Sequence, residues 1–253
     1  MQGLPRAKLS LLKRADGSVA LSQDGYTVIG AVNGPIEPSR RDELAEEAAV
    51  DVTIRPASGV SGVRERHTES IVSSALRHII LTHQHPRTVI QVTLQVTSTA
   101  GKGAAFSERP LVSQADSSLP ILPALLQASV FALLSASIPL STIFTSTILA
   151  INTAAQVVKS PTYKDLRDAT SVHVLSFTSH GDLLVAESEG DFDIDTWEKA
   201  FDAGKDICCR SRDSQVSEDL DMSGDQGNSI EDILRSAFEE KTSRDQRWKE
   251  EIG

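Results

Sequence analysis

Residues 119–140, LPILPALLQASVFALLSASIPL, contain no charged side chain, and the uncharged run extends from residue 117 to residue 158. Pro123 is tolerated in the first turn of a helix, where its missing N–H would have no partner, and Pro139 closes the far end. The sequence therefore predicts a helix over residues 123–137. About 15 helical residues span roughly 22 Å, less than the roughly 30 Å hydrocarbon layer of a membrane. We therefore expect a core helix and no membrane span.

Strands are predicted on both sides of this helix. VDVTI (residues 50–54) and IQVTLQV (residues 90–96) alternate apolar and polar residues with period two, which is typical of strands with one buried face. STIFTSTILAIN (residues 141–152) follows the helix and is apolar at most positions, as expected of a strand buried on both faces. Two hairpins are predicted at turn dipeptides that tolerate positive φ values, Asp24-Gly25 and His180-Gly181.

Two further helices are predicted, one before and one after the central run. RHTESIVSSALRHIILTHQHP (residues 66–86) carries an apolar stripe at helical spacing, and Pro86 forbids its continuation. The stripe consists of Ile71, Val72, Ala75, Leu76, Ile79 and Ile80. DFDIDTWEKAFDAGKDICCR (residues 191–210) begins with aspartates suited to helix capping.

The chain divides at about residue 210. Residues 1–210 are long enough for one domain with a sizeable core. Residues 211–228 are acidic, polar and rich in Gly and Ser, so we expect a disordered linker. Residues 229–253 place apolar side chains at helical spacing, which predicts a C-terminal helix. Such a helix either docks on a partner or remains a solvated tail.

The net charge of −10 is unevenly distributed. Residues 1–115 carry 13 Lys and Arg against 11 Asp and Glu, whereas residues 190–253 carry 9 against 18. The acidity of the C-terminal quarter therefore leaves room for an RNA-binding surface on the N-terminal part. The adjacent Cys208 and Cys209 favour no disulfide framework, and charges interrupt every candidate signal sequence, so we expect a reducing, intracellular compartment.

No common catalytic motif is present. The chain contains no Walker loop, GxGxxG, GxSxG or HExxH. His83 and His85 stand near a predicted helix end, where imidazoles often satisfy terminal carbonyl groups, and we expect neither to bind metal. His173 lies within a predicted strand and is expected to be a half-buried packing residue.

Two groups of charged residues are candidates for chemistry. Asp165 and Asp168 could form an acid–base or metal pair, although three-residue spacing in a charged loop is typical of a solvated surface. Arg64 and Arg66 end a glycine-bearing loop, and Arg87 precedes a strand. Guanidinium groups can bind phosphates bidentately, so these arginines are the predicted RNA-binding residues, with salt bridges as the alternative.

Several segments together resemble the RNase PH family. They are DGSVALSQDGYTVIGAVNGPIEPSRRDELAEEAAVDVTIRP (residues 16–56), HPR (residues 85–87) and ALLSASIPL (residues 132–140), and the likeness covers roughly residues 7–210. The resemblance implies an α+β fold of the ribosomal protein S5 domain 2 type, with mixed sheets backed by helices. It also implies pairing of subunits into a six-membered ring through which RNA passes.

Active members of that family use inorganic phosphate to degrade RNA from its 3′ end, which requires cations for the phosphate and acidic residues near the scissile bond. Aligned with those members, Leu122 stands where they carry an arginine, and Ser171 falls near their later catalytic acid. No Lys or Arg occurs between Arg109 and Lys159. The resemblance therefore implies no catalytic residue, metal or cofactor in this chain.

Three functions compete at this point. The leading one is a non-catalytic structural subunit of an RNA exosome core ring, supporting 3′-to-5′ RNA processing, rRNA maturation and surveillance in nucleus, nucleolus and cytoplasm. Its implied partners are other RNase PH-like ring subunits, cap subunits with RNA-binding domains, an associated catalytic ribonuclease and RNA. The alternatives are an active phosphorolytic or hydrolytic exoribonuclease, acting as a homodimer with a cation from a neighbouring chain, and an unrelated α+β interaction module.

Overall fold

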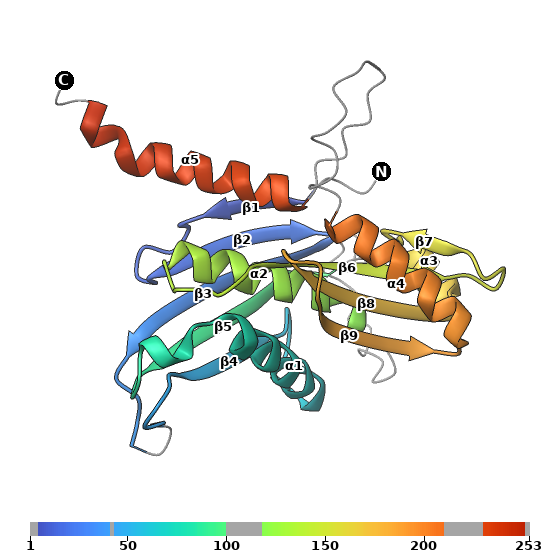
Figure 1. The fold of residues 1–253 in the computed structure, drawn as a ribbon, viewed down its shortest axis with the longest axis horizontal. Helices are drawn as coiled ribbons and strands as arrows, with labels where there is room; N and C mark the ends of the chain where they lie inside the picture. The colour runs from blue at the N-terminus through green and yellow to red at the C-terminus, as the bar shows by residue number, and fades with distance from the viewer. Residues whose placement is uncertain (1–4, 41–42, 100–117, 210–229, 251–253) are drawn as a thin grey trace.

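The computed structural model describes residues 5–40, 43–99, 118–209 and 230–250 (Figure 1). Its elements in chain order are β1 (Arg6–Leu9), β2 (Gly17–Gln23), β3 (Tyr26–Ile36), β4 (Ala49–Arg55), α1 (Val63–Ile79), the 3-10 turn η1 (Thr82–Gln84), β5 (Val89–Ser98), the 3-10 turn η2 (Leu119–Ile121), α2 (Leu122–Ser135), β6 (Phe144–Ile151), β7 (Val157–Lys159), α3 (Tyr163–Asp168), β8 (Ser171–Thr178), β9 (Leu183–Gly190), α4 (Ile194–Cys209) and α5 (Ile230–Glu250).

The strands form two sheets. The first has the order β1-β2-β3-β5-β4, in which β4 and β5 are parallel and the other pairs antiparallel. The second has the order β7-β6-β8-β9 and is antiparallel throughout. α1 makes the crossover that a parallel pair needs, between β4 and β5. The predicted α+β fold with mixed sheets backed by helices is confirmed.

The central helix α2 lies between the two sheets. It contacts β2 and β3 of the first sheet and β6 of the second (Figure 1). Every α2 residue except Leu134 is buried, and β6 is buried along its whole length. The core helix and the doubly buried strand are therefore confirmed, with the helix ending two residues earlier than predicted. No described helix is both long and apolar enough to cross a bilayer.

Two glycines let α2 approach the first sheet closely. A Cβ atom on Gly17 would overlap the carbonyl oxygen of Ala132 and the backbone nitrogen of Ala136. A Cβ atom on Gly30 would lie 3.2 Å from the carbonyl oxygen of Ala128. The helix backbone thus rests directly on the strand backbone at these two positions, because there is no side chain between them.

Both predicted hairpins are present. Asp24 and Gly25 have φ values of 51° and 80° in the two-residue turn that joins β2 to β3, as a type I′ turn requires. Gly181 has a φ of 87° in the turn between β8 and β9. The alternating strands β4 and β5 bury their predicted apolar faces.

The first predicted helix is shorter than its apolar stripe. α1 ends at Ile79, seven residues before Pro86, and Ile80 pairs with Leu140 in an isolated bridge. The carbonyl oxygen of Ile79 accepts a hydrogen bond from the N–H of Ser141 at 2.7 Å. Pairing with the segment after α2 therefore ends the helix before proline can. The short strands β1 and β7 and the helix α3 are not among the predicted elements.

Helix α5 packs on its own domain. Leu234, Ala237 and Phe238 lie against the core, and the rings of Phe131 and Phe238 stack with centroids 6.2 Å apart. Nζ of Lys241 donates to the carbonyl oxygen of Ser135 at 2.7 Å, at the C-terminus of α2, where a cation is favourable. The first part of α5 runs along β1, and its C-terminal end projects away (Figure 1). Residues 211–228, the expected linker, lie outside the described residues.

Candidate functional site

The two halves of the site implied by the family resemblance lie next to each other. The η2 turn, which leads directly into α2, contacts both β8 and β9. The segment expected to hold phosphate and the strand expected to carry the catalytic acid therefore meet. We call this meeting point of η2, the start of α2, β8 and β9 the η2 corner.

The phosphate half of the η2 corner is apolar. Leu122 is the first residue of α2 and is 1% exposed, so its side chain belongs to the core and offers no donor to an anion. The helix cap, Ile121, provides no side-chain hydrogen bond either. Since the sequence has no Lys or Arg from residue 110 to residue 158, no nearby position in the chain replaces the missing cation.

The acid half of the η2 corner consists of neutral, buried groups. Oγ of Ser171 lies 3.0 Å from Nε2 of His173, and Nδ1 of His173 lies 2.8 Å from Oγ of Ser188. The ring of Phe192 packs edge-on against the imidazole, with centroids 4.8 Å apart. Burial lowers the pKa of His173, which favours the neutral ring. His173 is fully buried, so the expectation of a half-buried residue is corrected.

The carboxylates upstream of this half serve the local fold. Asp165 lies in the short helix α3, so its expected position in a loop is wrong. Its Oδ2 accepts hydrogen bonds from the backbone N–H of Thr162 at 2.9 Å and from the Thr162 hydroxyl at 2.7 Å, which form a capping box. These bonds hold the pKa of Asp165 below its usual value. Asp168 is the exposed last residue of α3.

No metal centre is formed by the described part of the chain, where no group of three or more His, Cys, Asp or Glu side chains is arranged to hold an ion. His83 lies in η1 and His85 directly follows it, both beyond the end of α1. Their expected place at the end of a long helix is therefore corrected, because the helix ends at Ile79.

The predicted RNA-binding arginines do not form one cluster. Arg64 and Arg66 lie in the first turn of α1, whereas Arg87 lies beyond the other end of that helix. A helix of 17 residues is about 25 Å long, so the two groups face different parts of the surface. Arg66 is exposed, and the neighbouring Val63 is 85% exposed.

Arg87 also has local structural roles. Nε of Arg87 pairs with Oε1 of Glu43 at 3.5 Å, and its backbone N–H donates to the carbonyl oxygen of Leu44 at 3.1 Å. Its φ of 58° places it in the left-handed region, two residues before β5 begins at Val89. Its expected place at the start of a strand is therefore slightly wrong, and its salt bridge fits the alternative considered from the sequence.

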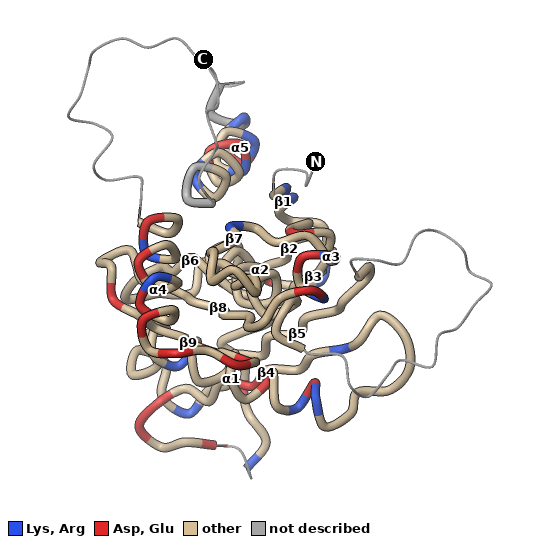
Figure 2. Tube along the Cα trace, turned by 90° about the vertical axis from the view of Figure 1, so that its right-hand side faces the viewer, with Lys and Arg blue, Asp and Glu red and all other residues tan. Residues whose placement is uncertain are grey.

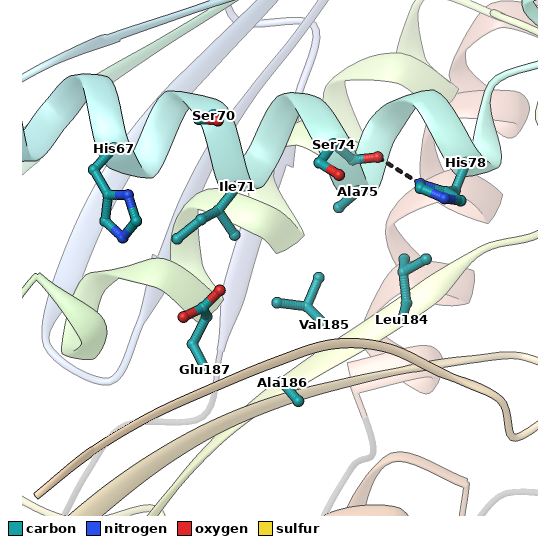
Figure 3. Close-up of a pocket in the computed structure, with 10 residues that line it drawn as sticks. All are labelled: His67, Ser70, Ile71, Ser74, Ala75, His78, Leu184, Val185, Ala186 and Glu187. Atoms are coloured by element: carbon teal, nitrogen blue, oxygen red, sulfur yellow. Dashed lines mark hydrogen bonds between the residues drawn. The ribbon is translucent and has the colours of Figure 1, made fainter.

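A groove that the sequence analysis missed lies between α1 and β9 (Figure 3). We call it the β9 groove; its volume is about 290 Å³. It is lined by His67, Ser70, Ile71, Ser74, Ala75 and His78 on α1 and by Leu184, Val185, Ala186 and Glu187 on β9. The side chain of Glu187 points toward the α1 face that carries His67 and Ile71. The signal in the sequence is the polar row at helical spacing within an otherwise apolar stripe.

Comparisons with known proteins agree with this architecture. The family model RNase PH, described as the 3′ exoribonuclease family, domain 1, matches residues 5–139. Exosome complex component RRP46 of Saccharomyces cerevisiae is 30% identical over 210 residues, which cover 80% of this chain and 89% of that protein.

Solved structures have the same fold. The crystal structure of rice (Oryza sativa) Rrp46 matches with a TM-score of 0.74 and 22% identity, covering 94% of this chain and 96% of that one. A chain of the Archaeoglobus fulgidus exosome with RNA bound to the active site matches with a TM-score of 0.63 and 12% identity, covering 81% and 85%.

Proposed function

Because this chain belongs to the RNase PH family of 3′ exoribonucleases, we propose that it is a non-catalytic structural subunit of an RNA exosome core ring. The observation that carries the proposal is the η2 corner, where Leu122 and the buried Ser171–His173 pair occupy the places of a phosphate-binding cation and an acid. The subunit contributes surfaces to the ring and lacks a reaction centre.

The chemistry explains why this corner is inactive. Phosphorolysis requires an anionic phosphate to approach an anionic phosphodiester, so fixed cations or aligned donors must offset the repulsion. A leucine side chain in the core supplies neither. The hydroxyl and neutral imidazole groups of β8 are engaged with each other and are buried, so they cannot replace an exposed carboxylate.

The partners in this proposal are other RNase PH-like subunits, cap subunits with RNA-binding domains and an associated catalytic ribonuclease. Support comes from the yeast relative, which is named an exosome complex component, and from the fold shared with a subunit of an archaeal exosome. The edge strands β4 and β9 each have one neighbour within this chain, so they offer backbone groups for pairing with ring neighbours.

The RNA contacts in this proposal come from the N-terminal part of the chain. Arg64 and Arg66 lie on the exposed first turn of α1, beside the loop that joins it to β4. Arg87 is a separate contact at the other end of α1. The proposed location follows that of exosomes, in the nucleus and nucleolus and also in the cytoplasm, with no membrane attachment.

Reconstitution tests the proposal. The full chain, co-expressed with RNase PH-like exosome ring subunits of the same organism, should co-elute with them as one ring-sized species, and omission of the chain should leave smaller assemblies. The ring with a catalytic ribonuclease should degrade RNA processively, and a ring reconstituted without this chain should not support that activity. A chain that elutes alone in every combination would instead favour an unrelated interaction module.

A further inference from the structure

The second sheet is one strand too narrow to cover the helical layer beneath it. The first sheet has five strands, and the second has four. α2 is covered on both sides, but the face of α1 that looks toward the second sheet reaches only the edge strand β9. The β9 groove is the space left beside that edge, with Ile71 half-buried on α1 and Val185 on β9.

The edge of β9 is suited to backbone pairing. β9 is hydrogen-bonded to β8 on one side, and the sheet ends there. An edge strand directs part of its N–H and C=O groups outward, and an extended peptide can pair with them. Within the second sheet, Val185 and Glu187 lie opposite Ser176 and Val174, so both face the helical layer and the groove.

The β9 side of the groove is strongly acidic. From residue 168 to residue 198 the chain contains no Lys or Arg and eight Asp or Glu. Figure 2 shows acidic residues along β9 and α4. The negative charge attracts a cationic partner and repels nucleic acid, because complementary charges select the partner and speed its association.

We propose that the β9 groove binds an extended, basic segment of a partner protein, which adds to β9 as a fifth strand. The proposal goes beyond ring assembly and does not depend on it. The residue opposite Val185 should be apolar, and the residue opposite Glu187 should be Lys or Arg, because directly opposed side chains lie about 4.5–5.5 Å apart in a sheet. Both of these residues face α1, so the matching segment alternates apolar and basic residues on one face.

A second copy of this chain does not provide such a segment in its own edge strand β1. Its basic residues, Arg6 and Lys8, share one face, and Ala7 and Leu9 share the other. A strand of this kind would place either two cations or two apolar residues in the groove. The required pattern has one of each on the same face, which favours a different protein.

The test uses the full chain and a fluorescent nine-residue peptide, TVSKTVSKT, which carries valine and lysine alternately on one face. Fluorescence anisotropy should give at least about tenfold tighter binding than for the same peptide with glutamate in place of lysine. N-methylation of alternate peptide amides, which removes strand pairing along one edge, should weaken binding by at least about tenfold. Hydrogen exchange at β9 amides should slow when the unmodified peptide binds.

Variants place the peptide in the groove. Glu187→Lys should weaken binding at least about fivefold, whereas Asp202→Lys, the same charge change on the exposed face of α4, should change it less than about twofold. Ser70→Trp, at an exposed position, should fill the groove and abolish binding; a thermal melt checks folding, and Glu187→Gln gives an independent second variant.

Three results would overturn the proposal: no binding of the lysine peptide, equal binding of the glutamate peptide, or equal loss in Glu187→Lys and Asp202→Lys. A concentration-dependent dimer that Ser70→Trp disrupts would also overturn it, because the occupant would then be a second copy. Since the assay uses the isolated chain, failure of the peptide to bind leaves the ring proposal intact, and failure of ring assembly leaves this one intact.

Discussion

Oγ of Ser171 lies 3.0 Å from Nε2 of His173, and both side chains are buried at the end of β8 that the family resemblance assigns to a catalytic acid. Nδ1 of the same imidazole contacts Oγ of Ser188 on β9. One ring nitrogen carries a proton and donates while the other accepts, and each has a hydroxyl partner. The strand is therefore stabilised by a neutral network where an active enzyme needs an exposed charge.

Stability should fall as the pH is lowered, and His173 should account for part of the loss. Burial holds the pKa of His173 below its unfolded value of about 6.5, so the unfolded chain binds the proton more readily. The contribution is fully present above about pH 6.5 and is lost as the pH falls through the lower folded pKa. Urea unfolding at pH 7.5 and pH 5.5 should show a smaller difference for His173→Asn than for the wild type.

His180→Asn is the matched control for this measurement, because His180 is exposed in the turn beside the same sheet. Its pH dependence should match that of the wild type. An unchanged difference in the His173→Asn protein would mean that His173 does not carry the effect.

The close contact between α2 and the first sheet should make Gly17 intolerant of a side chain. Gly17→Ala would drive a methyl group into the backbone of α2 at Ala132 and Ala136, and we expect a loss of about 2–4 kcal/mol in the free energy of unfolding. Gly62→Ala is the control, since only the flexible carboxylate of Glu65 lies near its Cβ position, at 3.3 Å. Similar unfolding midpoints in urea for both variants would contradict this account of the interface.

Much of the fold follows from the sequence because its signals are local. Period-two alternation identifies β4 and β5, and the Asp24-Gly25 turn fixes the β2–β3 hairpin. The charge-free run identifies α2 and β6 because a helix and a strand between two layers are apolar on every side. The missing cation at the η2 corner is also visible in the sequence, since it does not depend on alignment register.

Other features depend on contacts between distant segments. β1 has four residues, too few for a periodic signal, and is held by pairing with β2 and by α5. The end of α1 at Ile79 depends on Ser141, 62 positions later. The separation of Arg64 and Arg66 from Arg87 follows from the length of α1. The β9 groove exists because the two sheets differ in width, which no local pattern encodes.

The docking of α5 should depend on Phe238. Phe238→Ala removes the ring that stacks on Phe131, and we expect a loss of about 1–2 kcal/mol because the side chain is only partly buried. Hydrogen exchange in α5 should accelerate while exchange in α2 stays slow. Glu240→Ala, on an exposed side of the same helix, should leave α5 protected. Equal protection in the Phe238→Ala protein would show that other contacts hold the helix.

The RNA path should depend on the first turn of α1. In the assembled ring, Arg64→Ala combined with Arg66→Ala should weaken RNA retention and reduce the slope of log affinity against log salt by about 1. Arg77→Ala, in the last turn of α1, is the control and should have little effect. Filter binding at several salt concentrations measures both. An unchanged slope in the double variant would make these arginines purely structural.

The central claim is that this chain has no phosphorolytic centre, because its η2 corner has no cation for phosphate and no exposed acid. The most direct measurement is the release of nucleoside diphosphates from RNA by the purified chain, alone and in the ring, with and without orthophosphate. A phosphorolytic member of the family serves as the positive control. We predict no phosphate-dependent release above background from this subunit. Phosphate-dependent release that Asp168→Asn abolishes in a folded protein would contradict the claim.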